Sequence, residues 1–373
     1  MRIGVPKEVK NHEYRVGLTT LSVKELISAG HEVVVETNAG VGIGLTDAHY
    51  KEVGAKILAT AKEVFDTADM IVKVKEPQPS EYNLLRENQI LFTYLHLAPD
   101  PDQAKGLIDS KCVAIAYETV TDERGGLPLL APMSEVAGRM SVQVGAWMLE
   151  KSQGGKGVLL GSVPGVEPAR VVVLGGGVVG ANAARMAAAL GADVTIVDRN
   201  LKRLNELDWM FMGRLKTAYS TQAMIEKLVS KADLVIGAVL VVGASAPRLV
   251  TKDMLKTMSP GSVLVDVAID QGGCFETSRP TTHADPYYEV DGVLHYCVTN
   301  MPGAVARTST FALNNATLPF TMALANKGYK RALMDDKHLL NGLNVCKGRI
   351  THEIVARDLS MEYVEPGVAI VEA

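Results

Sequence analysis

Short apolar runs alternate with amphipathic stretches along the first 130 residues. The runs have the length of buried strands, and the stretches between them carry apolar residues at helical spacing. Such regular alternation predicts parallel βαβ units. The strands are expected at 3–5, 32–36, 70–74, 90–95 and 113–117, and the helices at 21–29, 47–53, 61–65 and 101–109.

A second region of alternation begins at residue 170. It follows a long helical pattern over 132–151 and a loop at 153–168 that contains five glycines and two prolines. A helix-length segment then extends from 303 to about 328, and helical patterns continue to the C-terminus. The strands of this region are expected at 171–174, 193–197, 234–238, 262–267 and 294–298.

The two regions predict an α/β protein with two Rossmann-like, doubly wound domains separated by an active-site cleft. A chain of 373 residues exceeds one ordinary hydrophobic core, which agrees with two domains. If the second sheet is inserted into the first, the helices at 132–151 and 303–328 would bridge the domains. The C-terminal segment would then complete the first sheet.

Composition and charge narrow the class of partner. Hydrophobic residues make up 47% of the chain and charged residues 21%, which is typical of a globular protein. The net charge of -4 and the absence of a Lys/Arg-rich run argue against nucleic acid and favour a small-molecule substrate. The four cysteines lack zinc-ligand spacing and are expected to be buried thiols, and no metal site is predicted. Without a signal-peptide pattern or an apolar run of about 18 residues, we expect a soluble, cytoplasmic protein with no membrane association.

A glycine-rich turn, Gly175-Gly-Gly177-Val-Val-Gly180, connects an expected strand to a helix-forming pattern. Gly175 permits the tight turn, Gly177 lets the backbone approach a pyrophosphate, and Gly180 allows the helix to pack closely on the strand. The helix N-terminus offers amide groups and a positive dipole to the phosphates. The turn therefore predicts a dinucleotide cofactor.

The choice between NAD and NADP is expected to depend on Asp198, which ends the next strand. Its carboxylate would accept hydrogen bonds from the adenine ribose hydroxyls and repel a 2′-phosphate, which favours NAD(H). The neighbouring Arg199 is able to pair with a phosphate, so the residues alone leave NADP open.

Four residues follow expected strands at the end where open α/β sheets bind ligands. His96 and Asp270 are able to exchange a proton or orient a water, although a structural histidine and a solvated loop aspartate fit these positions as well. Arg15 and Lys75 are able to hold a substrate carboxylate, with the alternative that both are surface cations. A second aspartate, Asp266, lies in the same segment as Asp270.

Several motifs contain these residues. They are Arg2-Ile-Gly-Val-Pro-Lys-Glu8, Asn11-x-x-x-Arg15-Val16, Val74-Lys-Glu-Pro77, Tyr94-Leu-His-Leu97, Ala131-Pro-Met-Ser-Glu-Val-Ala-Gly138, Val265-Asp-Val-Ala-Ile-Asp-Gln-Gly-Gly273 and Asn300-Met-Pro-Gly-Ala-Val305. With them the chain resembles the alanine dehydrogenase family over essentially its whole length. The resemblance implies reversible oxidation of L-alanine by NAD to pyruvate, ammonia and NADH.

The resemblance also implies roles for individual residues. Arg15 and Lys75 would bind the substrate carboxylate, His96 would be the acid/base, and Asp270 would act through water on the imine. At position 203 the family carries Lys, so Arg203 keeps the charge and changes the geometry. Besides the three glycines and Asp198, the dinucleotide would contact Ser134, Val178, Val179, Arg203, Ser220, Val239, Leu240, Val267, Asn300 and Met301.

The family is typically a homohexamer, so the resemblance implies a homo-oligomer. It also implies a substrate domain formed by residues 1–130 and completed by 304–373, with an NAD-binding domain at 131–303. Three alternatives remain at this point: the soluble NAD-binding component of a transhydrogenase, a saccharopine-type dehydrogenase, and a non-catalytic NAD-binding module. The transhydrogenase component lacks the His and Asp side chains found here at 96 and 270, and a silent module would leave all four candidate residues without a role.

Overall fold

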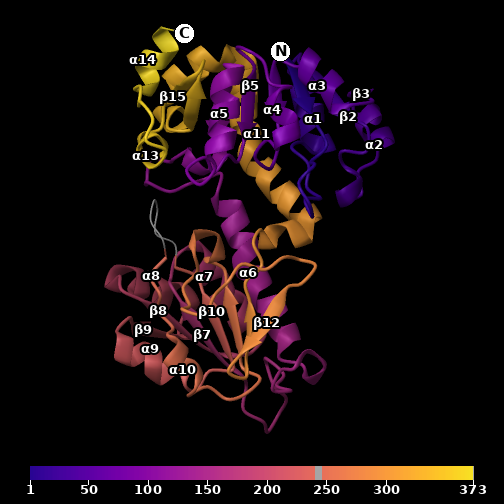
Figure 1. Cartoon of the computed structure of the whole chain (residues 1–373). Coiled ribbons are helices and arrows are strands. Elements are labelled where there is room, and N and C mark those ends of the chain that lie inside the picture. The colour runs from indigo at the N-terminus through magenta and orange to yellow at the C-terminus, as the bar shows by residue number, and fades with distance from the viewer. Residues whose placement is uncertain (240–245, 373) are drawn as a thin grey trace. The chain divides into compact units, whose positions relative to one another are not determined.

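The computed structural model describes residues 1–239 and 246–372, which form two compact units. The first unit consists of Met1–Met133 and Val305–Ala373, and the second consists of Ser134–Ala304. Each unit contains one sheet with helices packed against it (Figure 1). The expected α/β class with two parallel-rich sheets is therefore confirmed.

The sheet of the first unit has the strand order β15-β14-β6-β5-β4-β1-β2-β3. All neighbours from β3 to β6 are parallel, whereas β14 and β15 are antiparallel additions from the C-terminal segment. The strands are β1 (Arg2–Val5), β2 (Glu32–Glu36), β3 (Lys56–Leu58), β4 (Met70–Val72), β5 (Ile90–Thr93), β6 (Val113–Ala116), β14 (Leu343–Cys346) and β15 (Arg349–Ile350).

Several helices of the first unit begin at a side-chain cap. In α5, for example, the Asp100 side chain accepts a hydrogen bond from the Gln103 amide, and Pro101 occupies the first turn. The helices are α1 (Thr20–Ser28), α2 (Asp47–Glu52), α3 (Ala61–Thr67), α4 (Pro79–Tyr82), α5 (Pro101–Ser110), α11 (Ala306–Asp335), α12 (Lys337–Leu340), α13 (Glu353–Asp358) and α14 (Pro366–Val371), with short 3-10 turns η1 (Val41–Ile43) and η2 (Tyr117–Thr119).

The sheet of the second unit has the order β12-β13-β11-β10-β7-β8-β9 and is parallel except for β12. Its strands are β7 (Arg170–Leu174), β8 (Asp193–Asp198), β9 (Lys216–Tyr219), β10 (Leu234–Gly237), β11 (Val263–Asp266), β12 (Tyr287–Val290) and β13 (Val293–Tyr296). The helices are α7 (Val178–Ala189), α8 (Leu201–Phe211), α9 (Gln222–Val229) and α10 (Lys252–Leu255), with η3 (Lys151–Gln153), η4 (Ile269–Gln271) and η5 (Met301–Val305). Helix α6 (Ala131–Met148) crosses the boundary between the units.

The main differences from the sequence-based expectation concern the edges of the sheets. The pattern did not predict β3, β9 or β12, which are short and contain no fully buried residue. The C-terminal helical prediction was wrong at β14, whose buried Asn344 donates to Thr119 Oγ1 at 2.8 Å. Short apolar runs do not separate strand from helix by periodicity alone.

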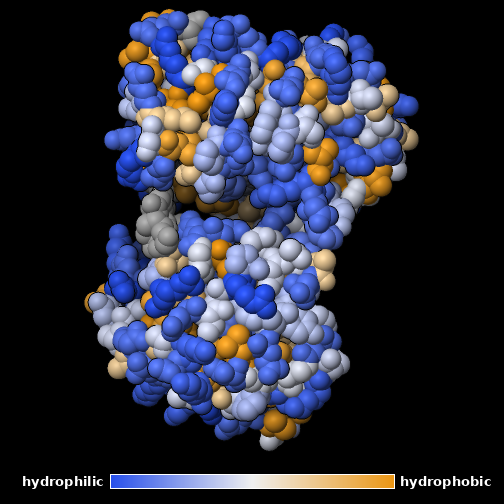
Figure 2. Space-filling model, viewed as in Figure 1, coloured by the Kyte–Doolittle hydropathy of each residue, from blue (hydrophilic) through white to orange (hydrophobic). Residues whose placement is uncertain are grey.

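The central strands supply the core. Strands β5, β6, β10 and β11 are buried along their whole length, as expected for strands covered on both faces. All four cysteines are buried free thiols, as predicted. The face drawn in Figure 2 is largely hydrophilic on each unit, with scattered apolar residues. In the described part of the chain, no helix combines the length and apolarity needed to cross a membrane.

Candidate functional site

Arg15, Lys75 and the glycine turn follow strands that flank the points where strand order reverses. In the first unit, β1 pairs with both β2 and β4, and in the second unit β7 pairs with both β8 and β10. Chains leaving such strands in opposite directions open a crevice at the carboxyl edge of an α/β sheet. Arg15 and Lys75 follow β1 and β4, and the glycine turn follows β7.

The glycine turn has little room for side chains at two of its three motif positions. A Cβ on Gly180 would lie 1.8 Å from the Gly175 carbonyl oxygen, and one on Gly175 would lie 2.7 Å from the Ala238 oxygen. Gly175 also has a φ of +101°, which favours glycine. By contrast, a Cβ on Gly177 would meet nothing within 4 Å. The backbone is thus exposed at Gly177, at the point where α7 begins.

Asp198 is tied to this turn by hydrogen bonds. Its Oδ2 accepts from the Gly176 amide at 2.6 Å and its Oδ1 from the Asn200 amide at 2.8 Å. Arg203 donates from Nε to the Gly176 carbonyl at 2.6 Å and pairs through Nη1 with Glu206 at 3.0 Å. The Asp198 carboxylate and the Arg203 guanidinium therefore bind the backbone N–H and C=O of the same residue, Gly176.

The other predicted cofactor residues are distributed over several loops of the second unit. Val178 and Val179 open α7, and Val239 follows β10. The remaining positions are Ser134 in α6, Ser220 after β9, Val267 after β11, Asn300 with a φ of +59°, and Met301 at the start of η5. Leu240 lies outside the described residues.

These features fit a dinucleotide. The exposed Gly177 backbone and the N-terminus of the twelve-residue helix α7 suit a pyrophosphate. The Asp198 carboxylate at the end of β8 suits ribose hydroxyls.

In the first unit, Arg15 forms a buried ion pair with Glu13. Glu13 Oε1 accepts from Arg15 Nε and Oε2 from Nη2, both at 2.6 Å, and Arg15 Nη1 donates to Met133 Sδ at 3.1 Å. The Arg15 and Glu13 side chains are 2% and 0% exposed. Burial opposes the charge on Arg15, but the hydrogen bonds and charge of Glu13 outweigh it and raise the pKa of Arg15. Arg15 is thus a buried, firmly charged cation.

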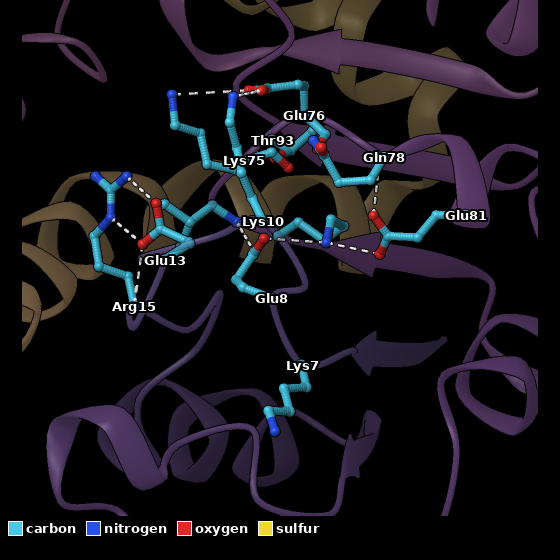
Figure 3. Close-up of polar contacts among 12 residues, drawn as sticks. Lys7, Glu8, Lys10, Glu13, Arg15, Lys75, Glu76, Gln78, Glu81 and Thr93 are labelled. Carbon is cyan, nitrogen blue, oxygen red and sulfur yellow. Dashed lines mark hydrogen bonds and ion pairs between the residues drawn. The ribbon is translucent and has the colours of Figure 1, made fainter. Parts of the chain in front are cut away.

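Lys75 lies close to a second acidic residue (Figure 3). Its Nζ is 3.8 Å from Glu76 Oε2, and the side chains are 15% and 11% exposed. Lys10 also pairs with Glu76. Burial disfavours the charged form of Glu76, but Lys75 and Lys10 outweigh it and lower the pKa of that carboxyl. The Lys75 carbonyl accepts a hydrogen bond from Thr93 Oγ1 at 2.9 Å, which connects this segment to β5.

His96 has a fixed backbone and an exposed ring. Its amide donates to Glu118 Oε1 at 2.6 Å, and the Leu95 amide donates to the same carboxylate. The residue has a φ of +48°, which is uncommon for a side chain other than glycine and is found at functional sites. The ring stacks on Tyr94 at 5.9 Å between centroids, and its Nδ1 is 3.9 Å from Glu118 Oε1. The expected strand at 90–95 ends earlier, at Thr93, because Glu118 takes the amides that would extend the ladder.

The structure places the two aspartates in different surroundings, Asp266 at the end of β11 and Asp270 in the loop that follows. Asp266 is fully buried and accepts from the Cys274 amide at 2.8 Å, the Ala268 amide at 3.1 Å and Ser278 Oγ at 2.5 Å. It holds the ends of the loop that carries Asp270. Burial raises the pKa of Asp266, although these hydrogen bonds act in the opposite direction. Asp270 is exposed on η4.

Sequence reasoning missed the acidic partners Glu13 and Glu118. Glu13 is two residues from Arg15, and Glu118 is far from His96 in the chain but follows the adjacent strand β6. Glu13 had a usable signal, because a carboxylate so close to a buried arginine is a natural partner. Glu118 had none beyond its position at the carboxyl end of a parallel strand.

Comparisons with known proteins agree along the whole chain. The family model described as alanine dehydrogenase/PNT, N-terminal domain, matches residues 4–137, and the corresponding C-terminal domain model matches residues 141–353. An alanine dehydrogenase of Halomonas elongata is 60% identical over 98% of each chain.

Solved structures give the same result. A structure of an L-alanine dehydrogenase has a TM-score of 0.94 and 54% identity, covering 96% of this chain and 99% of its own. A transhydrogenase from Sinorhizobium meliloti has a TM-score of 0.83 and 25% identity, covering 94% of this chain and 100% of its own.

Proposed function

The chain belongs to the alanine dehydrogenase/PNT family, and from that premise we propose which residues carry out its reaction. It is an NAD(H)-dependent oxidoreductase with alanine dehydrogenase activity. The reaction is the reversible oxidative deamination of L-alanine to pyruvate and ammonia. The observation that carries the residue assignment is a pair of cations after neighbouring strands: Arg15, which is held by Glu13, and Lys75, whose Nζ is 3.8 Å from Glu76 Oε2.

Arg15 and Lys75 bind the substrate carboxylate. Glu13 binds the Nε–Nη2 edge of Arg15 and so fixes the orientation of the guanidinium toward the substrate. Lys75 adds a second positive charge without a fixed geometry. The clamp fixes the amino acid so that its Cα–H is presented in one orientation, which removes much of the entropic cost of the reaction.

His96 is the acid/base of the reaction and Asp270 the second catalytic residue. The exposed imidazole accepts a proton as the amino group becomes an imine and returns it in the reverse direction. Asp270 orients the water that adds to the imine carbon, and loss of ammonia then gives the keto acid. Glu118 and Asp266 hold the two residues through backbone hydrogen bonds.

The second unit is the NAD-binding domain and the first is the substrate domain. Gly177 and the start of α7 would hold the pyrophosphate, and Asp198 the adenine ribose. The proposed set also includes Gly175 and Gly180 with the loop residues named above for the second unit. When bound, the nicotinamide accepts hydride from the substrate Cα.

The alternative activity within the family is hydride transfer between two nucleotides. It uses no amino-acid pocket, and it would leave the buried Arg15–Glu13 pair and the exposed His96 unexplained. The identity values also favour the dehydrogenase, at 60% against 25% for the transhydrogenase.

The proposal is tested by NADH consumption with pyruvate and ammonium. We expect rapid turnover that requires both substrates, with slower turnover of glyoxylate and 2-oxobutyrate. One methylene in a small apolar pocket is worth only about 1–3 kcal/mol, so 2-oxobutyrate should retain measurable activity. Hydride exchange between NADH and an NAD analogue, with no activity on pyruvate, would contradict the proposal.

Substitution of Asp198 by alanine is expected to reduce the preference for NAD over NADP. The ribose hydroxyls lose their acceptor, so KM for NAD should rise by about tenfold to a hundredfold, as for a lost charged hydrogen bond of about 1.5–3 kcal/mol. Removal of the negative charge also ends its repulsion of a 2′-phosphate. The measurement is kcat/KM for both nucleotides. An unchanged ratio in the variant would remove Asp198 from the cofactor site.

We also propose that the protein forms a homo-oligomer, with the hexamer of the family as the expected form. Its partners are otherwise small molecules: L-alanine, pyruvate, ammonia and NAD(H). Light scattering of the purified protein measures the mass directly.

A further inference from the structure

A buried ionic cluster lies in the same unit as the two proposed substrate cations, and Figure 3 shows two of its members, Glu8 and Glu81. Lys73 Nζ contacts Glu8 Oε2 at 3.1 Å and Glu81 Oε1 at 2.9 Å. The Lys73 side chain is 0% exposed and both glutamate side chains are 2% exposed. Burying three charges costs several kcal/mol per ion before pairing recovers it, so a cluster of this kind is poor evidence for stability alone.

Lys73 itself is unsuited to contact with substrate. It has no exposed surface, and its backbone carbonyl accepts a hydrogen bond from Tyr117 Oη at 3.1 Å. Burial disfavours its charge, but Glu8 and Glu81 outweigh burial and raise the pKa of Lys73. A permanently protonated, enclosed lysine is an anchor for carboxylates and not a nucleophile.

Glu8 connects this anchor to the segment that carries Lys75. Its Oε2 contacts Lys73 Nζ, and its Oε1 accepts from the Val74 amide at 2.7 Å. Val74 precedes Lys75, and its amide would otherwise be available to extend β4, which ends at Val72. The Lys75 carbonyl is held at the same time by Thr93 Oγ1 at 2.9 Å.

Glu81 has the same anchor and burial but a different second partner. Its Oε2 accepts from the Gln78 amide at 2.8 Å, which is the capping interaction at the start of α4. Glu8 and Glu81 therefore share Lys73, and only Glu8 holds the backbone next to Lys75.

Glu8 is also close enough to Arg15, the other proposed substrate cation, to interact with its charge. Its charge interacts electrostatically with Glu13 and with Arg15. Burial raises the pKa of Glu8, Lys73 lowers it, and Glu13 raises it. Lys7, the neighbour of Glu8, is exposed and its side chain points away from the cluster (Figure 3).

From this geometry we propose that Glu8, fixed by Lys73, is a positioning residue that holds the backbone from which Lys75 reaches the substrate carboxylate. The inference rests on the proposed role of Lys75. Its physical basis is that a small displacement of a positioning group has a large kinetic cost, while a buried hydrogen-bonded carboxylate resists such displacement.

The test compares Glu8→Gln with its matched control Glu81→Gln, with Lys7→Met as a surface control. Each glutamine variant removes one negatively charged partner of Lys73, and the two glutamate side chains are equally buried. Glutamine at position 8 keeps an oxygen acceptor but loses the ion pair with Lys73 that fixes this oxygen toward the Val74 amide. We therefore expect Glu8→Gln to raise KM for pyruvate about tenfold to a hundredfold, on the scale of a misplaced binding group. Glu81→Gln should have a clearly smaller effect, and Lys7→Met should behave as the parent protein. NADH affinity and Tm are measured for each variant.

The direction of the change separates positioning from a simple charge effect. If Glu8 acted only through its charge, its removal would make the surroundings of Arg15 and Lys75 more positive, and KM for pyruvate would fall. A fall, or equal effects in Glu8→Gln and Glu81→Gln, overturns the proposal. If Glu8→Gln does not fold, Glu8→Asp keeps the charge and shortens its reach, and it should raise KM in the same way.

A double-mutant cycle with Lys75→Met shows whether Glu8 acts through Lys75. In the Lys75→Met background, Glu8→Gln should cause no further rise in KM, because the group that it positions is gone. Additive effects contradict the inference. An unchanged KM in Lys75→Met alone would instead refute the proposed role of Lys75 and, with it, this inference. A raised KM in Lys75→Met with a normal Glu8→Gln variant refutes the inference only.

Discussion

Replacement of His96 by alanine is expected to lower kcat by at least about a hundredfold, the usual contribution of a general acid/base, while NADH binding is retained. The imidazole is 47% exposed, so its removal leaves no buried cavity and should change Tm little. The experiment measures kcat with pyruvate and ammonium and titrates NADH by fluorescence. An unchanged kcat would remove His96 from the mechanism.

Two further variants make this result specific. His31→Ala removes a histidine of the same unit that hydrogen-bonds Asn326 at the surface, and it should leave kcat unchanged. Glu118→Gln retains an acceptor for the Leu95 and His96 amides but changes the charge near Nδ1, 3.9 Å away. It should have an effect of the same sign as His96→Ala and smaller. If Glu118→Gln loses activity as completely as His96→Ala and also has a lowered Tm, the Glu118 contact has a structural role.

The parallel sheets were predictable because their central strands are continuous apolar runs between amphipathic helices. Strands such as β10 and β11 are buried along their length, and this leaves a direct signature in the sequence. Edge strands have a weaker signature in the sequence because they are partly exposed. In β9, for example, Lys216 and Tyr219 at the two ends are exposed. Pairing of β14 with β6 joins residues more than 200 positions apart, and local periodicity contains no information on such contacts.

The candidate site residues can be proposed from the sequence, whereas the contacts that hold them cannot. The glycine turn, His96 and Asp270 are proposed from strand ends and motif spacing, which are local features. The carboxylates that hold them are brought close by strand order, as with Glu118 beside His96. Two strands also end earlier than expected, because Glu8 and Glu118 take amides that would extend β4 and β5. Side-chain acceptors that replace ladder hydrogen bonds at a functional edge are invisible to hydrophobic periodicity.

Replacement of Arg15 by alanine is expected to raise KM for pyruvate by about tenfold to a hundredfold or more, because a charged hydrogen bond is worth about 1.5–3 kcal/mol. The substitution has a second consequence. It leaves the Glu13 carboxylate, which is 0% exposed, without its guanidinium, and breaking a buried pair in this way costs about 3–5 kcal/mol of stability. A low activity in Arg15→Ala alone would therefore confuse binding with folding.

The double variant Glu13→Gln with Arg15→Ala separates these effects. Neutral glutamine removes the buried negative charge that has lost its guanidinium, so the Tm of the double variant should recover toward that of the parent protein. The carboxylate clamp is still missing, so KM for pyruvate should remain raised. If KM recovers together with Tm, Arg15 contributes to folding and not to substrate binding. If KM stays high in a stable double variant, the guanidinium acts on the substrate directly, and the buried Glu13 serves to hold it in place.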